Sequence, residues 1–266
     1  MGALSGVTRM EIDGRAVTAE EAEVYALTSY GHFTAMQVRG GRTRGLALHL
    51  ARLRAATAEM FGAELDEDLV RVRIRHALGG DSGSGQILDA SVRVMVFQAQ
   101  DDAPVTIMVT VREPYIESGA PQTLTSVPYQ RPLPHLKQIG GGFGQAYYGR
   151  AARRAGFDDA LLTAPDGTVS EGSIANIAFV TGGTLVWPDA PALAGITMQL
   201  LQAQFGDRSK GATVRLADLG SYDAALLTNS RGIIPVSRID DHRFAGDPTV
   251  LEAVGQAYES APWDVL

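Results

Sequence analysis

The stretch that decides the fold is "LKQIGGGFGQAYYGRAARRAGFDDALLTAPDGTVSEGSIANIAFV", residues 136–180. In it Lys137 precedes three consecutive glycines. The chain has one other lysine, Lys210, and its remaining basic residues are arginines. Arginine can replace a surface lysine in most roles, but it cannot lose its proton and form an imine. Lys137 is therefore a candidate nucleophilic amine, and a solvated surface lysine is the alternative interpretation.

The same stretch predicts a helix followed by short strands. Residues 143–156 predict a helix that ends at Gly156. Residues 158–188 predict strands joined by Pro-Asp-Gly and Gly-Gly turns. Glu171 lies among these strands in a mostly apolar context. It is a candidate buried acid, and a strand-end carboxylate that faces water is the alternative.

The sequence before this stretch predicts a compact β-α-α-β unit. Apolar residues alternate in its strands and recur at helical spacing in its helices. The predicted elements are a hairpin at 10–17, a strand pair at 32–45, helices at 46–60 and 64–80, and adjacent strands at 91–97 and 105–111. Mixed strands and helices in this order indicate an α+β fold.

A proline-rich segment predicts the boundary between two domains. Five prolines occur within residues 113–134, a composition typical of a connector. We therefore predict a small N-terminal domain at 1–112 and a larger C-terminal domain at 135–266. The larger domain is predicted to contain a helix at 194–205, and a buried strand with a polar turn within 224–236.

Composition excludes several classes of function. A net charge of -7 argues against a general nucleic-acid binder. The chain has no long apolar run, no signal-peptide pattern and no cysteine, so we expect no membrane span and a cytoplasmic location. The five histidines lack ligand spacing, so no metal site is expected.

Three further segments carry groups that could bind an anion. Arg52 lies off the apolar stripe of its predicted helix. The helix start at 195–197 offers backbone N–H groups to a phosphate, and residues 227–232, "LTNSRG", offer hydroxyl and amide groups at a turn. An ordinary helix start and an ordinary turn explain these segments equally well when each is taken alone.

Taken together and in this order, the segments resemble the class IV aminotransferase family. These are pyridoxal-phosphate enzymes of fold type IV, and they include branched-chain aminotransferases, D-amino-acid transaminases and 4-amino-4-deoxychorismate lyases. Besides residues 136–180, the resemblance rests on "LHLARLRAA" (48–56), "LAGIT" (193–197) and "TNSRGIIPV" (228–236). It implies a two-domain α+β fold that binds pyridoxal 5'-phosphate at the domain interface.

The resemblance also implies roles for matching residues. Lys137 matches the lysine that forms the internal aldimine and moves the substrate's α-proton. Glu171 matches the acid that pairs with the pyridine nitrogen, and Arg52 matches the phosphate-binding arginine. The remaining phosphate-binding positions match Gly195, Ile196, Thr197 and Asn229.

The departures from the family pattern concern the substrate. "SYGHFTAMQVR" (29–39) lacks the family's aspartate and places His32 and Phe33 on the strand expected to face the substrate. Ser230 and Arg231 are further candidate substrate contacts. Branched-chain enzymes have a tyrosine where this chain has Gly142. The phenolic oxygen of the cofactor therefore has no assigned partner, and the candidates are Tyr147 and Tyr148.

The resemblance implies a pyridoxal-phosphate-dependent aminotransferase. We expect it to move an amino group between an amino acid or amine and a 2-keto acid, and to form a homodimer. One alternative is the β-elimination of the aminodeoxychorismate lyases, which releases pyruvate. Another is a cofactor-binding protein with little catalytic activity.

Overall fold

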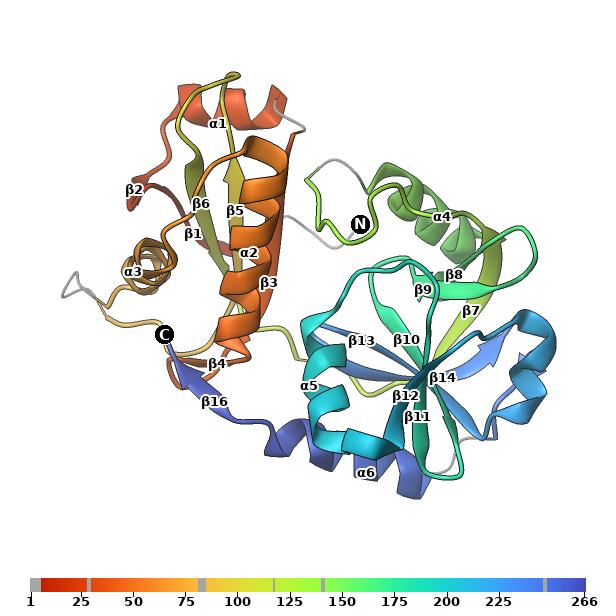
Figure 1. Ribbon diagram of the computed structural model, residues 1–266. Helices are drawn as coiled ribbons and strands as arrows, with labels where there is room; N and C mark the ends of the chain where they lie inside the picture. Colours follow the sequence, from red (N-terminus) through yellow and green to blue (C-terminus); the bar gives the residue numbers. More distant parts are fainter. Residues whose placement is uncertain (1–5, 28–29, 81–84, 117, 140–141, 246–247) are drawn as a thin grey trace. The chain divides into compact units, whose positions relative to one another are not determined.

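The computed structural model describes residues 6–27, 30–80, 85–116, 118–139, 142–245 and 248–266 (Figure 1). The chain divides into two compact units. Unit 1 contains the described residues within Met1–Ile116, Leu136–Gly141 and Pro262–Leu266. Unit 2 contains those within Glu117–His135 and Gly142–Ala261.

Unit 1 is built on a five-stranded antiparallel sheet with the strand order β2-β1-β6-β5-β3. Its strands are β1 (Val7–Ile12), β2 (Arg15–Ala16), β3 (Gly31–Val38), β5 (Ala90–Phe97) and β6 (Thr106–Arg112). The helices α2 (Leu46–Phe61) and α3 (Glu67–Ala77) pack their leucine, valine and isoleucine side chains against the valines of β5 and β6. This face of the sheet forms the core of unit 1. Helix α1 (Ala19–Leu27) places Tyr25 in a second apolar cluster with Met95 and Phe97.

The last residues of the chain complete unit 1. Strand β16 (Trp263–Val265) pairs with β4 (Arg42–Arg44). The Asp264 carboxylate accepts a hydrogen bond from the backbone N–H of Leu46 at 2.8 Å. Because the N-cap residue of α2 is a glycine with no side chain to cap the helix, Asp264 takes this role from the far end of the sequence.

Unit 2 is built on a nine-stranded mixed sheet with the order β12-β11-β10-β13-β14-β7-β8-β9, and β15 pairs with β14. The strands are β7 (Gln122–Pro128), β8 (Asp159–Thr163), β9 (Val169–Gly172), β10 (Asn176–Thr181), β11 (Thr184–Pro188), β12 (Ser209–Ala212), β13 (Ala224–Asn229), β14 (Gly232–Ile239) and β15 (His242–Arg243).

Three helices pack on this sheet. Helix α4 (Phe143–Arg154) packs on β8 through Ala152. Helices α5 (Ile196–Phe205) and α6 (Pro248–Ser260) pack together on the strands that carry Trp187 and Leu226. The largest cluster of unit 2 surrounds Phe179. Short 3-10 helices occur at Gly206–Arg208 and Leu216–Ser221.

The segment 113–134 differs from the predicted connector. Its residues Gln122–Pro128 form β7, which pairs in parallel with both β14 and β8 inside the large sheet. The reason is local. Residues 122–127, which lie between Pro121 and Pro128, contain no proline and include two threonines and a valine, so each of their backbone N–H groups can donate to a neighbouring strand. Residues 136–139 and 262–266, which we assigned to the C-terminal domain, belong to unit 1, where both segments pair with its strands.

No helix within the described residues combines the length and apolar character needed to cross a membrane.

Candidate active site

The backbone of Lys137 is fixed along an edge of the unit 1 sheet. Strand β3 is an edge strand, and the segment 137–139 extends the sheet beside it. The Phe33 N–H donates to the Lys137 carbonyl at 2.9 Å, and the Ile139 N–H donates to the Gly31 carbonyl at 2.7 Å. Two backbone hydrogen bonds therefore set the position from which the Lys137 side chain extends.

Gly31 makes this pairing possible. A Cβ atom at Gly31 would lie 2.8 Å from the Val96 carbonyl oxygen and 3.0 Å from Ile139 Cδ1. Both distances are below ordinary van der Waals contact, and the carbonyl belongs to the backbone of β5. The absence of a side chain at Gly31 therefore lets the lysine segment approach β3.

The ring of Phe33 holds two cations. Lys137 Nζ lies 4.9 Å from the ring centroid and Arg93 Cζ lies 4.5 Å from it, within the range of cation–π attraction. Sequence reasoning missed Arg93. A signal was present, because Arg93 interrupts an apolar strand that pairs with β3, and residues near each other on one face of paired strands interact.

The predicted cations Lys137 and Arg52 act on the same buried histidine. His49 lies on α2 and its Nδ1 is 2.6 Å from Thr34 Oγ1 of β3. Burial, and to a smaller extent the charges of Arg52 and Lys137, lower the pKa of His49 to about 3. The imidazole is therefore neutral near pH 7. Lys137 of unit 1 thus lies at the ring of Phe33, and both Lys137 and Arg52 lie close enough to His49 to act on its charge.

His32 lies on the opposite face of β3 from Phe33. Its Nε2 is 3.0 Å from Thr57 Oγ1, and its ring packs 5.9 Å from that of Phe61 on α2. Because the Thr57 hydroxyl donates to the Leu53 carbonyl, it accepts from His32, which places the imidazole proton on Nε2. Burial lowers the pKa of His32 to about 4. Of the two residues expected to face the substrate, only Phe33 contacts Lys137.

Glu171 lies on β9 in unit 2 with its carboxylate buried. Its Oε1 is 3.5 Å from Arg131 Nε, and the two side chains are 5% and 9% exposed. Its Oε2 accepts a hydrogen bond from the Leu193 N–H at 3.3 Å. A buried carboxylate needs such compensation, because leaving it without partners costs several kcal/mol. The predicted buried acid thus has a charged partner in Arg131 and a neutral hydrogen-bond donor in the Leu193 N–H.

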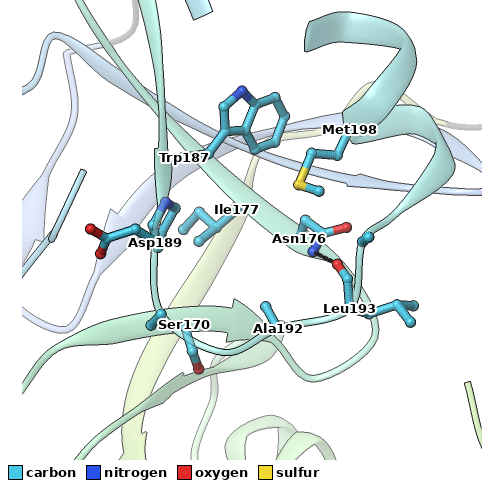
Figure 2. A pocket seen from close by; sticks show the side chains of 11 residues that line it. Ser170, Asn176, Ile177, Trp187, Asp189, Ala192, Leu193 and Met198 are labelled. Atoms are coloured by element: carbon cyan, nitrogen blue, oxygen red, sulfur yellow. Dashed lines mark hydrogen bonds between the residues drawn. The ribbon is translucent and has the colours of Figure 1, made fainter. Parts of the chain in front are cut away.

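Leu193, whose N–H donates to Glu171, is also held through its carbonyl group by Asn176. Figure 2 shows the Asn176 Nδ2 donating to the Leu193 carbonyl, at 2.6 Å. A Cβ atom on Gly195 would collide with the Asn176 amide oxygen, so the start of α5 lies close against this side chain. Trp187, Ile177 and Met198 line a cavity of about 220 Å³ beside it (Figure 2).

Four of the predicted phosphate-binding residues, Gly195, Ile196, Thr197 and Asn229, meet where α5 begins, whereas Arg52 lies on α2 in unit 1. Gly195 is the N-cap residue and no side chain caps the helix; Ile196 and Thr197 are buried in the first turn. The Thr197 hydroxyl donates to the Asn229 carbonyl at 2.7 Å, which ties the helix start to the end of β13. The hydroxyl of Thr197 therefore fastens this end of the site.

These residues fit a phosphate-bearing cofactor. The N–H groups of a first helical turn have no partner within the helix, and its positive dipole end attracts anions. Thr228 is buried beside them, and its hydroxyl has no hydrogen-bond partner in the described part of the chain. Thr228 pairs with Asn176 across β10 and β13, so its side chain lies on the sheet face that Asn176 turns toward Gly195.

The candidate substrate residues Ser230 and Arg231 lie in the turn between β13 and β14. The Asn229 side chain accepts from the Arg231 N–H at 2.8 Å and so shapes this turn. Arg231 is exposed and Ser230 is half-buried.

Gly142 immediately precedes α4, and neither candidate tyrosine fills the space that it leaves. Tyr147 is 52% exposed and stacks on Phe143. Tyr148 packs between Tyr147 and Tyr129. A Cβ atom at Gly144 would collide with the ring and hydroxyl of Tyr129. Tyr129, the residue after β7, therefore packs against the first turn of α4.

Comparison with known proteins identifies the family. The sequence matches the family "amino-transferase class IV" over residues 31–239. A comparison with curated protein sequences gave no match. Several solved structures share the fold at low sequence identity.

Three of these structures illustrate the likeness. The branched-chain aminotransferase of Thermoproteus uzoniensis with norvaline has a TM-score of 0.81 at 20% identity, covering 96% of this chain and 94% of that one. The fold IV transaminase of Curtobacterium pusillum has a TM-score of 0.76 at 21% identity, covering 88% and 87%. A hypothetical aminotransferase of Mycobacterium tuberculosis in its pyridoxal-phosphate-bound form has a TM-score of 0.80 at 20% identity, covering 95% and 98%.

The chain belongs to the class IV aminotransferase family, because the family match spans most of its length. The two-unit α+β structure has the fold of the type IV transaminases. The predicted fold class, the enzyme class and the cofactor class are thereby confirmed: this is a pyridoxal-phosphate-dependent aminotransferase.

Proposed function

We propose that the protein transfers an amino group from an amino acid to a 2-keto acid, with Lys137 as the residue that bonds to the cofactor. The observation that carries this proposal is the fixed Lys137 segment along β3, with its amine at the Phe33 ring. Apart from Lys137, the only lysine side chain is Lys210, which is exposed on β12.

Glu171, Arg52, the start of α5 and Lys137 each have a part in this proposal. Pyridoxal phosphate, when bound, supplies an electron sink for the carbanion at the substrate's α-carbon. Glu171 holds the proton on the pyridine nitrogen, while Arg52 and the start of α5 bind the phosphate. The amine of Lys137 takes the α-proton of the substrate and returns it.

Arg93 supplies the contact for a substrate carboxylate. It lies at the Phe33 ring together with Lys137, and a guanidinium binds a carboxylate with two parallel hydrogen bonds. A carboxylate-bearing donor and acceptor therefore suit the site better than simple amines. Arg231 stays a second candidate for this role. A homodimer and a cytoplasmic location also stay predictions.

The visible spectrum of the cofactor-loaded protein tests the proposal. An amino acid donor should bleach the yellow colour, and a 2-keto acid should restore it. Release of pyruvate from aminodeoxychorismate without an acceptor would instead indicate the lyase reaction. A colour that no amino donor changes would indicate a cofactor-binding protein and would contradict transamination.

A further inference from the structure

The geometry points to Arg131 as a positioning residue that holds the Glu171 carboxylate ionised and in place. The inference rests on the proposed role of Glu171 at the pyridine nitrogen. Arg131 Nε lies 3.5 Å from Glu171 Oε1, and both side chains are almost fully buried. A guanidinium is always charged in a protein, so it gives a permanent countercharge to the acid.

Arg131 also fastens the turn in which it lies. Its guanidinium donates to the carbonyl of Pro134. Between them, Leu133 has a φ of 46°, a left-handed conformation that costs a bulky residue energy, and its side chain is 55% exposed. Burial of the leucine does not compensate for this cost. The Arg131–Pro134 hydrogen bond therefore stabilises a strained turn that precedes Lys137 by three residues in the sequence.

The other oxygen of Glu171 is fixed independently of Arg131. It accepts from the Leu193 N–H, and the Leu193 carbonyl is held by Asn176. The cross-strand neighbour of Glu171 on β8 is the apolar Leu162. Two segments thus orient the carboxylate. Arg131 provides a positive charge, and the Leu193 N–H provides a neutral hydrogen-bond donor.

The chemical consequence concerns the protonation of Glu171. An opposite charge nearby favours the ionised form of a carboxyl group, and burial without that charge favours the neutral form. The ionised carboxylate accepts a charge-assisted hydrogen bond from a protonated pyridine nitrogen and balances its charge, whereas a neutral carboxyl group makes a weaker bond and supplies no countercharge. Loss of Arg131 should therefore neutralise Glu171 at a pH where the wild-type acid is charged, and so weaken its hold on the cofactor.

The test compares Arg131→Gln, Glu171→Gln and the double variant as full-length proteins without cofactor. Denaturant unfolding is measured from pH 5.5 to 8.5. In Arg131→Gln we expect the buried Glu171 carboxyl to have a higher pKa in the folded chain than in the unfolded chain. The free energy of unfolding of this variant should therefore fall, relative to that of the wild type, as pH rises. The double variant should lose that dependence, because it has no carboxyl group to ionise. Arg131→Lys should restore part of the stability, since it returns the charge without the planar geometry.

A matched control is available on the surface. Arg54 pairs with Glu67 at 3.0 Å, but the Arg54 side chain is exposed. Removal of an exposed partner has little effect on stability, so Arg54→Gln should unfold as wild type does at every pH. If Arg131→Gln follows the pH dependence of Arg54→Gln, the inference is wrong.

Titration with pyridoxal phosphate separates this inference from the proposed function. Arg131→Gln should bind the cofactor roughly tenfold to a hundredfold more weakly than wild type, the loss expected for a charged contact, and Arg54→Gln should bind it normally. If Glu171→Gln binds cofactor and turns over like wild type, the proposed role of Glu171 fails. The unfolding series would still show whether Arg131 holds the carboxylate.

Discussion

Arg93 and Lys137 share the ring of Phe33 but have different chemical roles. Lys137 can lose its proton and bond to an aldehyde, whereas the guanidinium of Arg93 stays charged and suits a carboxylate. Side chains alternate between the two faces of β3, so Phe33 points toward the lysine and His32 points toward α2. Sequence reasoning identified the strand but did not distinguish its two faces.

A first prediction concerns Arg93→Gln. Without the guanidinium, an amino acid donor should lose a charged contact, so its kcat/KM should fall roughly tenfold to a hundredfold. A donor amine that has no carboxylate should react as it does with the wild type. Steady-state kinetics with the two donor classes provide the measurement. An equal loss for both classes would mean that Arg93 does not bind the carboxylate.

A second prediction concerns the buried imidazole of His49. Burial lowers its pKa from 6.5 to about 3, so between these values the unfolded chain binds more protons than the folded chain. The stabilisation is therefore complete above pH 6.5 and is lost as pH falls. Relative to His49→Asn, the wild type should lose about 2 kcal/mol of unfolding free energy between pH 7.5 and pH 5.

Denaturant unfolding of both proteins at the two pH values measures this difference. His242→Asn is the control, because His242 is half-exposed against Phe244. Equal pH dependence in the wild type and His49→Asn would contradict a neutral buried imidazole at His49.

At the scale of elements, the lysine segment is a short extension of an edge strand. Its residues 137–139 do not form a regular strand, and the alternating pattern that reveals strands in a sequence is absent there. The sequence thus predicts the strand β3 but not its pairing with residues 137–139. The strand β7 was not predicted, because the prolines around it led us to assign the segment to a connector.

Gly31→Ala tests this pairing. The added methyl group would meet the Val96 carbonyl oxygen and the Ile139 side chain, so we expect a loss of about 1 to 3 kcal/mol in unfolding free energy. The reaction of Lys137 with pyridoxal phosphate, followed by absorbance, should slow as well. Gly85→Ala has open space around it and should behave as wild type. If Lys137 of Gly31→Ala reacts with pyridoxal phosphate as it does in the wild type, the pairing of residues 137–139 with β3 does not position Lys137.

At the scale of the whole molecule, each unit has its own apolar core, and residues distant in the sequence complete it. The periodicity of helices and strands made the α+β class predictable. The joining of β16 to β4, and of Arg131 to Glu171, was not predictable, because each depends on contacts between segments far apart in the chain. The candidate site residues that the sequence indicated are those that carry the family motifs.

The cap that Asp264 provides to α2 gives a prediction at this scale. Asp264→Ala should remove the hydrogen bond to the Leu46 N–H and lower the unfolding free energy of the protein by about 1 kcal/mol. Chemical denaturation gives the value. Val265→Ala, which removes part of an exposed side chain of the same strand, should change it by less than about 0.5 kcal/mol. If the two variants lose the same stability, the carboxylate does not cap α2.

The central claim is that Lys137 is the residue that bonds to the cofactor, and one measurement tests it most directly. Borohydride reduction of the pyridoxal-phosphate-loaded protein makes any bond between the cofactor and an amine permanent, and peptide mass spectrometry then locates it. Lys210 is the internal control, being the only other lysine and exposed. We predict the label on the peptide that contains Lys137, at one equivalent per chain, and its loss in Lys137→Ala but not in Lys210→Arg. A label on Lys210, or full labelling of Lys137→Ala, would contradict the account.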